Sequence, residues 1–171
     1  MFIFFHIAVP LLFFEIPKIK EKISINRFAL LIGAVIPDLI DKPLVLLGWG
    51  SGRGISHSLL FLIISTSIVF LGEAVQGRKP FLRNNILTIS YLTGITIHIL
   101  LDLPEVPLFY PFIPYPYSVE GNLILMWLEN LILDPFNLFS ELFGITVILY
   151  VIYRNKLYHI KNLWDYLTIN Q

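Results

Sequence analysis

Long apolar runs separated by short polar segments dominate the chain. Five stretches are mainly apolar, at residues 1–14, 28–48, 58–72, 86–103 and 137–153. A sixth, at 122–133, is shorter and contains Glu129. None alternates as a half-buried strand does, and an open sheet in lipid would leave backbone groups without partners. The pattern therefore predicts helices, most of them below the roughly 20 residues that cross a bilayer upright.

Composition extends this picture to a single membrane domain covering residues 1–171. Hydrophobic residues make up 56% of the chain, charged residues 14%, and the mean hydropathy is +0.76. There is no cysteine, which leaves His, Asp and Glu as candidate metal ligands. The net charge is zero and no basic face is evident, so nucleic acid is not an expected partner. The first apolar run lacks the basic start of a signal peptide, and we expect it to be retained.

The distribution of basic residues predicts the topology. Ten of the twelve lysines and arginines lie in three alternate segments, 15–27, 72–85 and the tail from Tyr153. The positive-inside rule assigns these segments to the cytoplasm and the N-terminus to the outside. The sequence therefore predicts an all-α, compact polytopic bundle of about five transmembrane helices. Its C-terminus would be cytoplasmic and its location the inner or plasma membrane.

The segment at 103–121 is rich in proline and aromatic residues and contains no basic residue. Proline disfavours a regular helix, and aromatic side chains favour the headgroup level of a membrane. Two interpretations stay open, an interfacial connector or a lid over a site. The next segment, 122–133, can either span the membrane or lie at its interface.

Ionisable residues at one predicted end of the bundle suggest chemistry. Asp38 and Asp41 are spaced i, i+3, and His98 and Asp102 are spaced i, i+4, so each pair lies on one helix face. With the topology above, these four residues share the outer half with two further histidines, His6 and His57. Ionisable residues within membrane segments are costly and are usually functional.

These six residues form a ligand set typical of one or two divalent ions, with zinc first and manganese or iron as alternatives. Such a set also suits hydrolysis at a two-metal site. Each residue has a simpler explanation. His6 can be a satisfied core histidine, and His98 with Asp102 a hydrogen-bonded helix pair. Asp41 with Lys42 can be an ion pair at a helix end.

A glycine-rich turn, "SGRGISHS", precedes the third apolar stretch. Helix N-termini attract anions, and Arg53 within the turn can bind phosphate or carboxylate through two hydrogen bonds. We therefore expect Arg53 and Ser58 to bind an anionic part of a substrate, although Arg53 can also be a plain loop charge.

The order of these motifs resembles the YdjM-like family of inner-membrane metal-dependent hydrolases. An N-terminal His6 is followed by "GAVIPDLID", "RGISHS" and "HILLD", similar to the family's Gly-x-x-x-Pro-Asp-x-Asp, Arg-Gly-x-x-His-Ser and His-x-x-x-Asp elements. The resemblance covers residues 1 to about 115. Asp41 stands one position later than the second aspartate of the family pattern, so the resemblance carries over to Asp38 more directly. It implies a metal-dependent hydrolase whose substrate is undefined.

The expected function is a membrane-embedded hydrolase acting on a phosphate- or ester-bearing, lipid-like amphiphile near the outer interface. Its partners would then be membrane lipid and this amphiphilic substrate. Catalytic roles would fall to Asp41, Arg53 and His57, with Asp41 as metal ligand or general base. Two alternatives remain, a metal-ion transporter and a membrane protein that a metal merely stabilises.

Overall fold

The computed structural model describes residues 3–47, 52–75, 85–114 and 123–168, and every regular element in these ranges is helical. Each of the five long apolar stretches forms a helix, so the all-α prediction is confirmed for the described residues. The helices are α1 (Ile3–Glu15), α3 (Arg27–Leu46), α4 (Leu59–Val75), α5 (Ile86–Leu101) and α7 (Pro135–Arg154). Shorter elements connect or flank them, namely α2 (Pro17–Lys20), the 3-10 turn η1 (Ile55–His57), α6 (Leu123–Leu133) and α8 (Ile160–Thr168).

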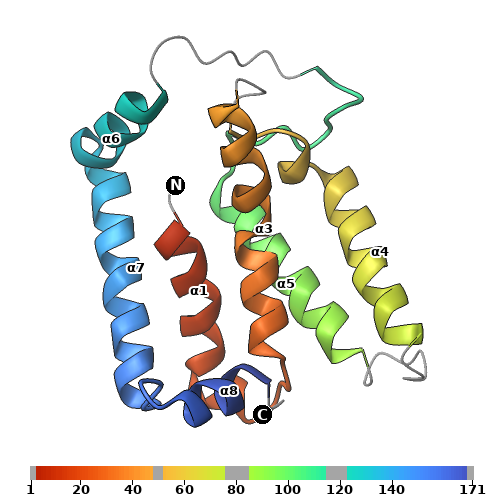
Figure 1. Cartoon of the computed structure of the whole chain (residues 1–171), viewed down its shortest axis with the longest axis vertical. Helices are drawn as coiled ribbons and strands as arrows, with labels where there is room; N and C mark the ends of the chain where they lie inside the picture. Colours follow the sequence, from red (N-terminus) through yellow and green to blue (C-terminus); the bar gives the residue numbers. More distant parts are fainter. Residues whose placement is uncertain (1–2, 48–51, 76–84, 115–122, 169–171) are drawn as a thin grey trace.

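The five long helices lie side by side along the long axis of the molecule (Figure 1). In that view α7, α1, α3, α5 and α4 follow one another, with α6 over the upper end of α7 and α8 across the lower end. One core cluster joins α1, α7 and α8 through Ala8, Val147 and Tyr166. A second joins α3 and α5 through Ala29 and Ile95. The N-terminus of α1 and the described C-terminus thus lie at opposite ends of the bundle.

Glycines bring α3 and α5 unusually close together. A Cβ added to Gly33 would lie 2.3 Å from the carbonyl oxygen of Tyr91, and one added to Gly94 would lie 2.1 Å from that of Leu30. Real side chains cannot approach a backbone atom so closely, so both positions require glycine for this packing. Asp38 and His98 lie about one turn beyond these contacts. The close approach therefore places the polar residues of the two helices within reach of each other.

Proline does not divide α3. Pro37 and Pro43 both lie inside the continuous helix Arg27–Leu46. Proline lacks an N–H group, so each one removes a hydrogen bond from the helix. The Pro37 carbonyl accepts a 2.8 Å hydrogen bond from Ser56 Oγ, which holds η1 against this part of α3.

Buried carboxylates cap two helices from neighbouring helices. Glu73 on α4 accepts hydrogen bonds from the backbone N–H groups of Leu87 and Thr88 at the start of α5, at 3.0 and 2.9 Å. Glu141 on α7 accepts from the N–H groups of Phe4 and Phe5 at the start of α1, each at 3.2 Å. A carboxylate at a helix N-terminus satisfies free donors and complements the helix dipole. These two acidic residues therefore have structural roles.

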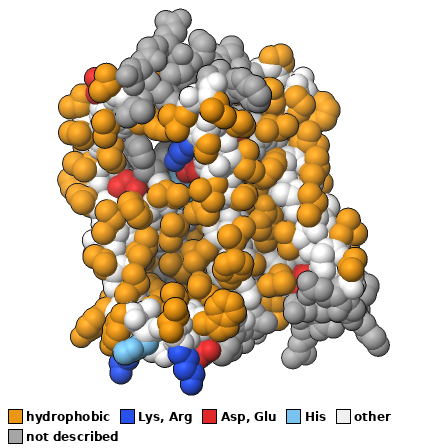
Figure 2. Space-filling model, in the orientation of Figure 1, with side chains coloured by type: hydrophobic (Ala, Val, Ile, Leu, Met, Phe, Trp, Pro, Cys, Tyr) orange, Lys and Arg blue, Asp and Glu red, His pale blue; other side chains and the backbone are white. Residues whose placement is uncertain are grey.

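Apolar side chains cover the sides of the bundle (Figure 2). Ile68 on α4 is 63% exposed and Phe139 on α7 is 70% exposed. Among the described residues, α7 alone combines the length and the apolar composition of a membrane span. The helix α3 is also 20 residues long, but it contains Arg27, Asp38, Asp41 and Lys42. The number of crossings and their orientation therefore stay predictions.

The segment predicted as a connector or lid is described only in part. Residues 103–114 fold back against the bundle, where Val106 is buried and the Leu108 carbonyl accepts a 2.9 Å hydrogen bond from Leu59 N–H. Residues 115–121 lie outside the described residues, as do Arg78, Lys79 and Arg83 of the second basic segment. The segment 122–133 forms a separate short helix, α6, from Leu123 onward.

Candidate metal centre

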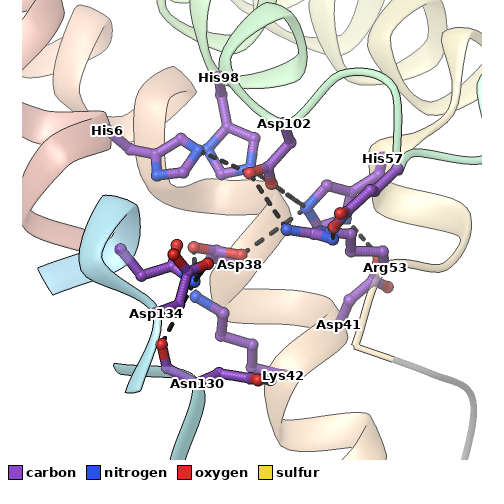
Figure 3. A network of polar contacts seen from close by, with 12 residues as sticks. His6, Asp38, Asp41, Lys42, Arg53, His57, His98, Asp102, Asn130 and Asp134 are labelled. Atoms are coloured by element: carbon purple, nitrogen blue, oxygen red, sulfur yellow. Dashed lines mark hydrogen bonds and ion pairs between the residues drawn. The ribbon is translucent and has the colours of Figure 1, made fainter. Parts of the chain in front are cut away.

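Four elements bring the six predicted ligands to one place in the bundle (Figure 3). These residues are His6 from α1, Asp38 and Asp41 from α3, His57 from η1, and His98 with Asp102 from the end of α5. None is more than 4% exposed. Burying several charges and imidazoles together is costly without compensation, so these side chains need hydrogen-bond or ionic partners.

Four of the six form a group that can hold one metal ion. Ligand atoms of Asp38, His57, His98 and Asp102 all lie within 4.8 Å of one another. His57 Nε2 lies 3.7 Å from Asp38 Oδ1 and 3.5 Å from Asp102 Oδ2. Tetrahedral ligands with metal bonds near 2.0–2.1 Å lie about 3.3 Å apart, and the two His57 contacts are close to that spacing. We refer to these four residues as the metal group.

Hydrogen bonds orient both histidines of the metal group. His98 Nδ1 lies 2.6 Å from the Ala34 carbonyl oxygen, which can only accept, so Nδ1 carries the proton. His57 Nδ1 lies 2.7 Å from Asp41 Oδ2. In each ring Nε2 is therefore the atom directed into the metal group. Metal-binding histidines are commonly held in this way through the other nitrogen.

Asp41 contacts His57 through the ring nitrogen that faces away from the metal group. Its Oδ2 contacts His57 Nδ1 and accepts a 2.6 Å hydrogen bond from the N–H of Gly54. The sequence predicted Asp41 as ligand or general base, whereas these contacts hold the imidazole of His57 in position. Ser56, which was not a predicted site residue, lies in η1 and holds it against α3 through its hydrogen bond to the Pro37 carbonyl.

His6 lies next to the metal group but is not part of it. Its Nε2 is 3.4 Å from Asp102 Oδ1, and its ring centroid is 4.1 Å from that of His98. Asp102 thus directs Oδ2 toward the two histidines of the metal group and Oδ1 toward His6. The four-residue group can hold one ion without His6, which packs beside it.

Two basic side chains contact the carboxylates of the metal group. Lys42 Nζ lies 2.6 Å from Asp38 Oδ2. Arg53 Nη2 lies 3.5 Å from Asp102 Oδ1, and the same guanidinium pairs with Glu105. Burial would lower the pKa of Arg53, but the carboxylates of Asp102 and Glu105 raise it. The guanidinium therefore stays charged.

Electrostatics at η1 favour a positive charge. Burial by itself would lower the pKa of His57, but contacts with Asp102, Asp38 and Asp41 raise it to about 10. Three carboxylates around one imidazole therefore stabilise a cation at this position. A divalent ion would satisfy the same field while using Nε2 as a ligand.

Ser58 has a different place from the one expected. Its hydroxyl donates a 2.6 Å hydrogen bond to the Ile55 carbonyl and accepts a 3.2 Å bond from Phe61 N–H at the start of α4. The side chain is fully buried, and it does not line the cavity described next. These contacts give Ser58 a helix-capping role.

A cavity of about 1030 Å³ adjoins the metal group. Its lining includes Asp38 and Asp102 of the metal group together with Lys42 and Arg53. Residues of α6, α7 and the Asp134 between them form another part of the lining, which we call the α6–α7 wall. They are mostly apolar, with a few polar residues among them, and include Met126, Trp127, Asn130, Leu131, Asp134, Asn137, Leu138, Leu142 and Ile145. No motif in the sequence predicted this wall. Its only local signal is the polar residues within "LENLILDPFN".

Comparison with known families assigns the chain. The profile of the YdjM inner membrane protein family matches residues 1–160. The chain belongs to the YdjM family. This match includes all six clustered residues and also α6 and α7, so it extends well beyond the motifs before residue 115. As a YdjM family member, the chain is an inner membrane protein, as predicted. Comparisons with curated proteins and with solved structures give no match.

Proposed function

We propose that this YdjM family member is a membrane-embedded, metal-dependent hydrolase of phosphate- or ester-bearing amphiphiles. The observation that carries the proposal is that the metal group borders a large, partly apolar cavity, which Asp38 and Asp102 line. Two neutral imidazoles and two carboxylates form a donor set that suits zinc, and also manganese or iron.

The chain's residues would divide the work between holding the ion and holding the substrate. Asp38, His57, His98 and Asp102 would bind the ion, and Asp41 would keep His57 in the correct orientation. Bound there, a divalent ion supplies a Lewis acid and lowers the pKa of water. Arg53 lies beside Asp102 and faces the cavity, so it can stabilise negative charge on a reacting group.

The cavity supports an amphiphilic substrate. Its lining combines charged residues of α3 and of the turn before η1 with Trp127, Leu138 and Ile145 of the α6–α7 wall. A polar head would then lie against the metal group while an apolar chain contacts this wall. Pockets of this kind fix orientation with few polar groups and gain affinity from apolar surface.

A topology of five crossings with the N-terminus outside would place the metal group in the outer half of the membrane. Lys18 and Lys20 lie on α2 and Lys161 lies on α8, at the end of the bundle opposite the metal group (Figure 1). The positive-inside rule makes that end cytoplasmic. The substrate would accordingly enter the cavity from the outer leaflet.

The cavity also favours a hydrolase over a purely structural metal. Structural metal sites are closed by four protein ligands, so an ion held by these four residues would act in hydrolysis by adding a further ligand from the cavity side, as catalytic zinc does when it becomes five-coordinate. Here Asp38 and Asp102 both line the cavity as well as belonging to the metal group.

Metal analysis of the detergent-purified full-length protein tests the proposal. We expect the wild type to contain about one transition-metal ion per chain, and the double variant Asp38→Ala, His57→Ala to contain none. Asp134→Ala is the matched control, because Asp134 lines the same cavity outside the metal group. A wild type without metal would refute the metal site. A metal-loaded protein that releases neither phosphate nor fatty acid from a panel of lipids would refute hydrolysis alone.

A further inference from the structure

Lys42 and Arg53 are placed unusually among the basic residues of the chain. They are the two of twelve that lie outside the three basic segments. Both line the cavity, and each side chain is 27% exposed. Each one also contacts a carboxylate of the metal group. A charged side chain away from the cytoplasmic end has a desolvation cost, so a shared location at one cavity end suggests a shared ligand.

Lys42 and Arg53 contact the carboxylate oxygens of Asp38 and Asp102 that do not face His57. Asp38 directs Oδ1 toward His57 Nε2 and binds Lys42 through Oδ2. Asp102 directs Oδ2 toward His57 Nε2, and its Oδ1 lies 3.5 Å from Arg53. Each carboxylate thus connects the metal group to one cation. Figure 3 shows Lys42 beside Asp38 and Arg53 beside Asp102.

Lys42 and Arg53 determine the sign of the net charge of the metal-loaded centre to which a substrate would bind. With neutral histidines, Asp38, Asp41 and Asp102 contribute three negative charges, which Lys42 and Arg53 reduce to one. A divalent ion then makes the centre positive by one charge. Without the two cations, the same loaded centre would be negative by one and would repel an anion.

Other carboxylates near the cavity do not cancel the positive net charge of the metal-loaded centre. Glu105 pairs with Arg53, but its side chain is 67% exposed, so water screens it and an incoming anion can replace it. Glu141 accepts hydrogen bonds at the N-terminus of α1, and Asp134 accepts a 2.9 Å bond from Phe136 N–H at the start of α7. Helix N-termini offset both charges.

We propose that Lys42 and Arg53 form a phosphate-binding pair, and that the substrate is a phosphate monoester of an apolar alcohol. This inference rests on the proposed function. A terminal phosphate is a dianion with three free oxygens, enough to reach the ion, Lys42 and Arg53 together, whereas a carboxylic ester is neutral and a phosphodiester carries one charge. In the reaction, water's oxygen bonds to phosphorus and the bond from phosphorus to the alcohol oxygen breaks. One water proton ends on the alcohol, and inorganic phosphate is released.

Binding of inorganic phosphate to the metal-loaded, full-length protein in detergent tests this pair. Calorimetry would compare the wild type with Lys42→Met, which keeps the apolar stem, and Arg53→Gln. We expect each variant to weaken phosphate binding by about tenfold or more while the metal content stays unchanged. Lys42→Arg should restore most of the affinity. Lys161→Met, on the exposed face of α8, is the control and should bind phosphate as the wild type does.

The outcomes separate this inference from the metal proposal. Wild-type phosphate affinity in metal-loaded Lys42→Met and Arg53→Gln would overturn the pair and leave the metal site intact. Loss of metal in Lys42→Met would also overturn it, because Lys42 would then act only by holding Asp38. A wild type that binds no metal overturns both proposals. In turnover assays, phosphate released from a long-chain alkyl phosphate supports the inference, and preferred cleavage of a dialkyl phosphate or a fatty-acid methyl ester overturns it.

Discussion

His57 Nε2 and His98 Nε2 lie 3.2 Å apart, although 41 positions separate the two residues in the chain. Asp41 and the Ala34 carbonyl hold the Nδ1 atom of the respective ring. Two imidazole lone pairs therefore face each other at this distance unless a proton or a cation lies between them. Asp38 and Asp102 complete the surroundings, and together the four residues can hold one cation.

Asp38 and Asp41 should differ in their effect on metal binding. Asp38→Ala removes an oxygen of the metal group, so we expect bound metal to be lost. Asp41→Asn removes only the carboxylate that orients His57, and such supporting contacts typically contribute 10- to 100-fold in affinity. Competition with a fluorescent chelator measures both. Equal losses in the two variants would show that Asp41 is itself a ligand.

Metal binding should release a proton and become tighter as pH rises. In the metal-free protein, the three carboxylates raise the pKa of His57 to about 10, so below that pH the imidazole holds a proton that a metal must displace. Apparent affinity should then increase by about tenfold per pH unit on approaching this pKa. Calorimetry in buffers of different ionisation enthalpy counts the released protons. A pH-independent affinity between pH 7 and 9 would contradict a protonated His57.

Removal of the metal should lower thermal stability. An ion that binds only the folded protein stabilises it by about 4 kcal/mol when its concentration is 1,000 times its dissociation constant. We expect a chelator to lower the Tm of the wild type and to leave that of Asp38→Ala, His57→Ala unchanged. An equal response in the variant would mean that the chelator acts elsewhere.

Gly33→Ala and Gly94→Ala should separate α3 from α5. Each new methyl group would overlap a backbone carbonyl of the other helix, and overpacking of this kind costs about 1–3 kcal/mol. Because Asp38 and His98 lie just beyond these contacts, metal affinity should fall as well. Gly72→Ala on α4 is the control, since its Cβ would meet nothing within 4 Å. Thermal unfolding in detergent and metal analysis give the two readouts.

Glu73→Ala should loosen the start of α5. The change leaves the N–H groups of Leu87 and Thr88 without their carboxylate, and loss of a helix cap costs about 1–2 kcal/mol. Hydrogen exchange should therefore increase first at residues 87–88. Glu21→Ala, at an exposed position, is the control, and equal exchange in the two variants would remove the capping role.

Local sequence determined much of the helical pattern and the chemistry of the site. Apolar runs can be recognised without knowledge of their neighbours, and each became a helix in the described residues. His, Asp and Arg were also identifiable, because ionisable residues in apolar segments stand out against their surroundings. Their spacing along α3 and α5 placed Asp38 with Asp41, and His98 with Asp102, on common helix faces. Each of these properties depends on a single segment of the chain and not on how the segments pack together.

Tertiary structure alone decided how these residues divide their roles. Asp38 faces the metal group and Asp41 lies behind His57 because the turn around Gly54 packs against α3, which spacing cannot reveal. The cavity wall from α6 and α7 depends on helices distant in the chain, so Trp127 carried no recognisable signal, and Asn137 stood out only as a polar residue next to an apolar run. From the sequence, Lys42 was interpreted as a partner of Asp41 in an ion pair at a helix end. The structure instead places Lys42 beside Asp38 and in the cavity lining. Sequence determined which groups are present, and packing decided which atoms meet, because contacts between helices depend on their separation and orientation.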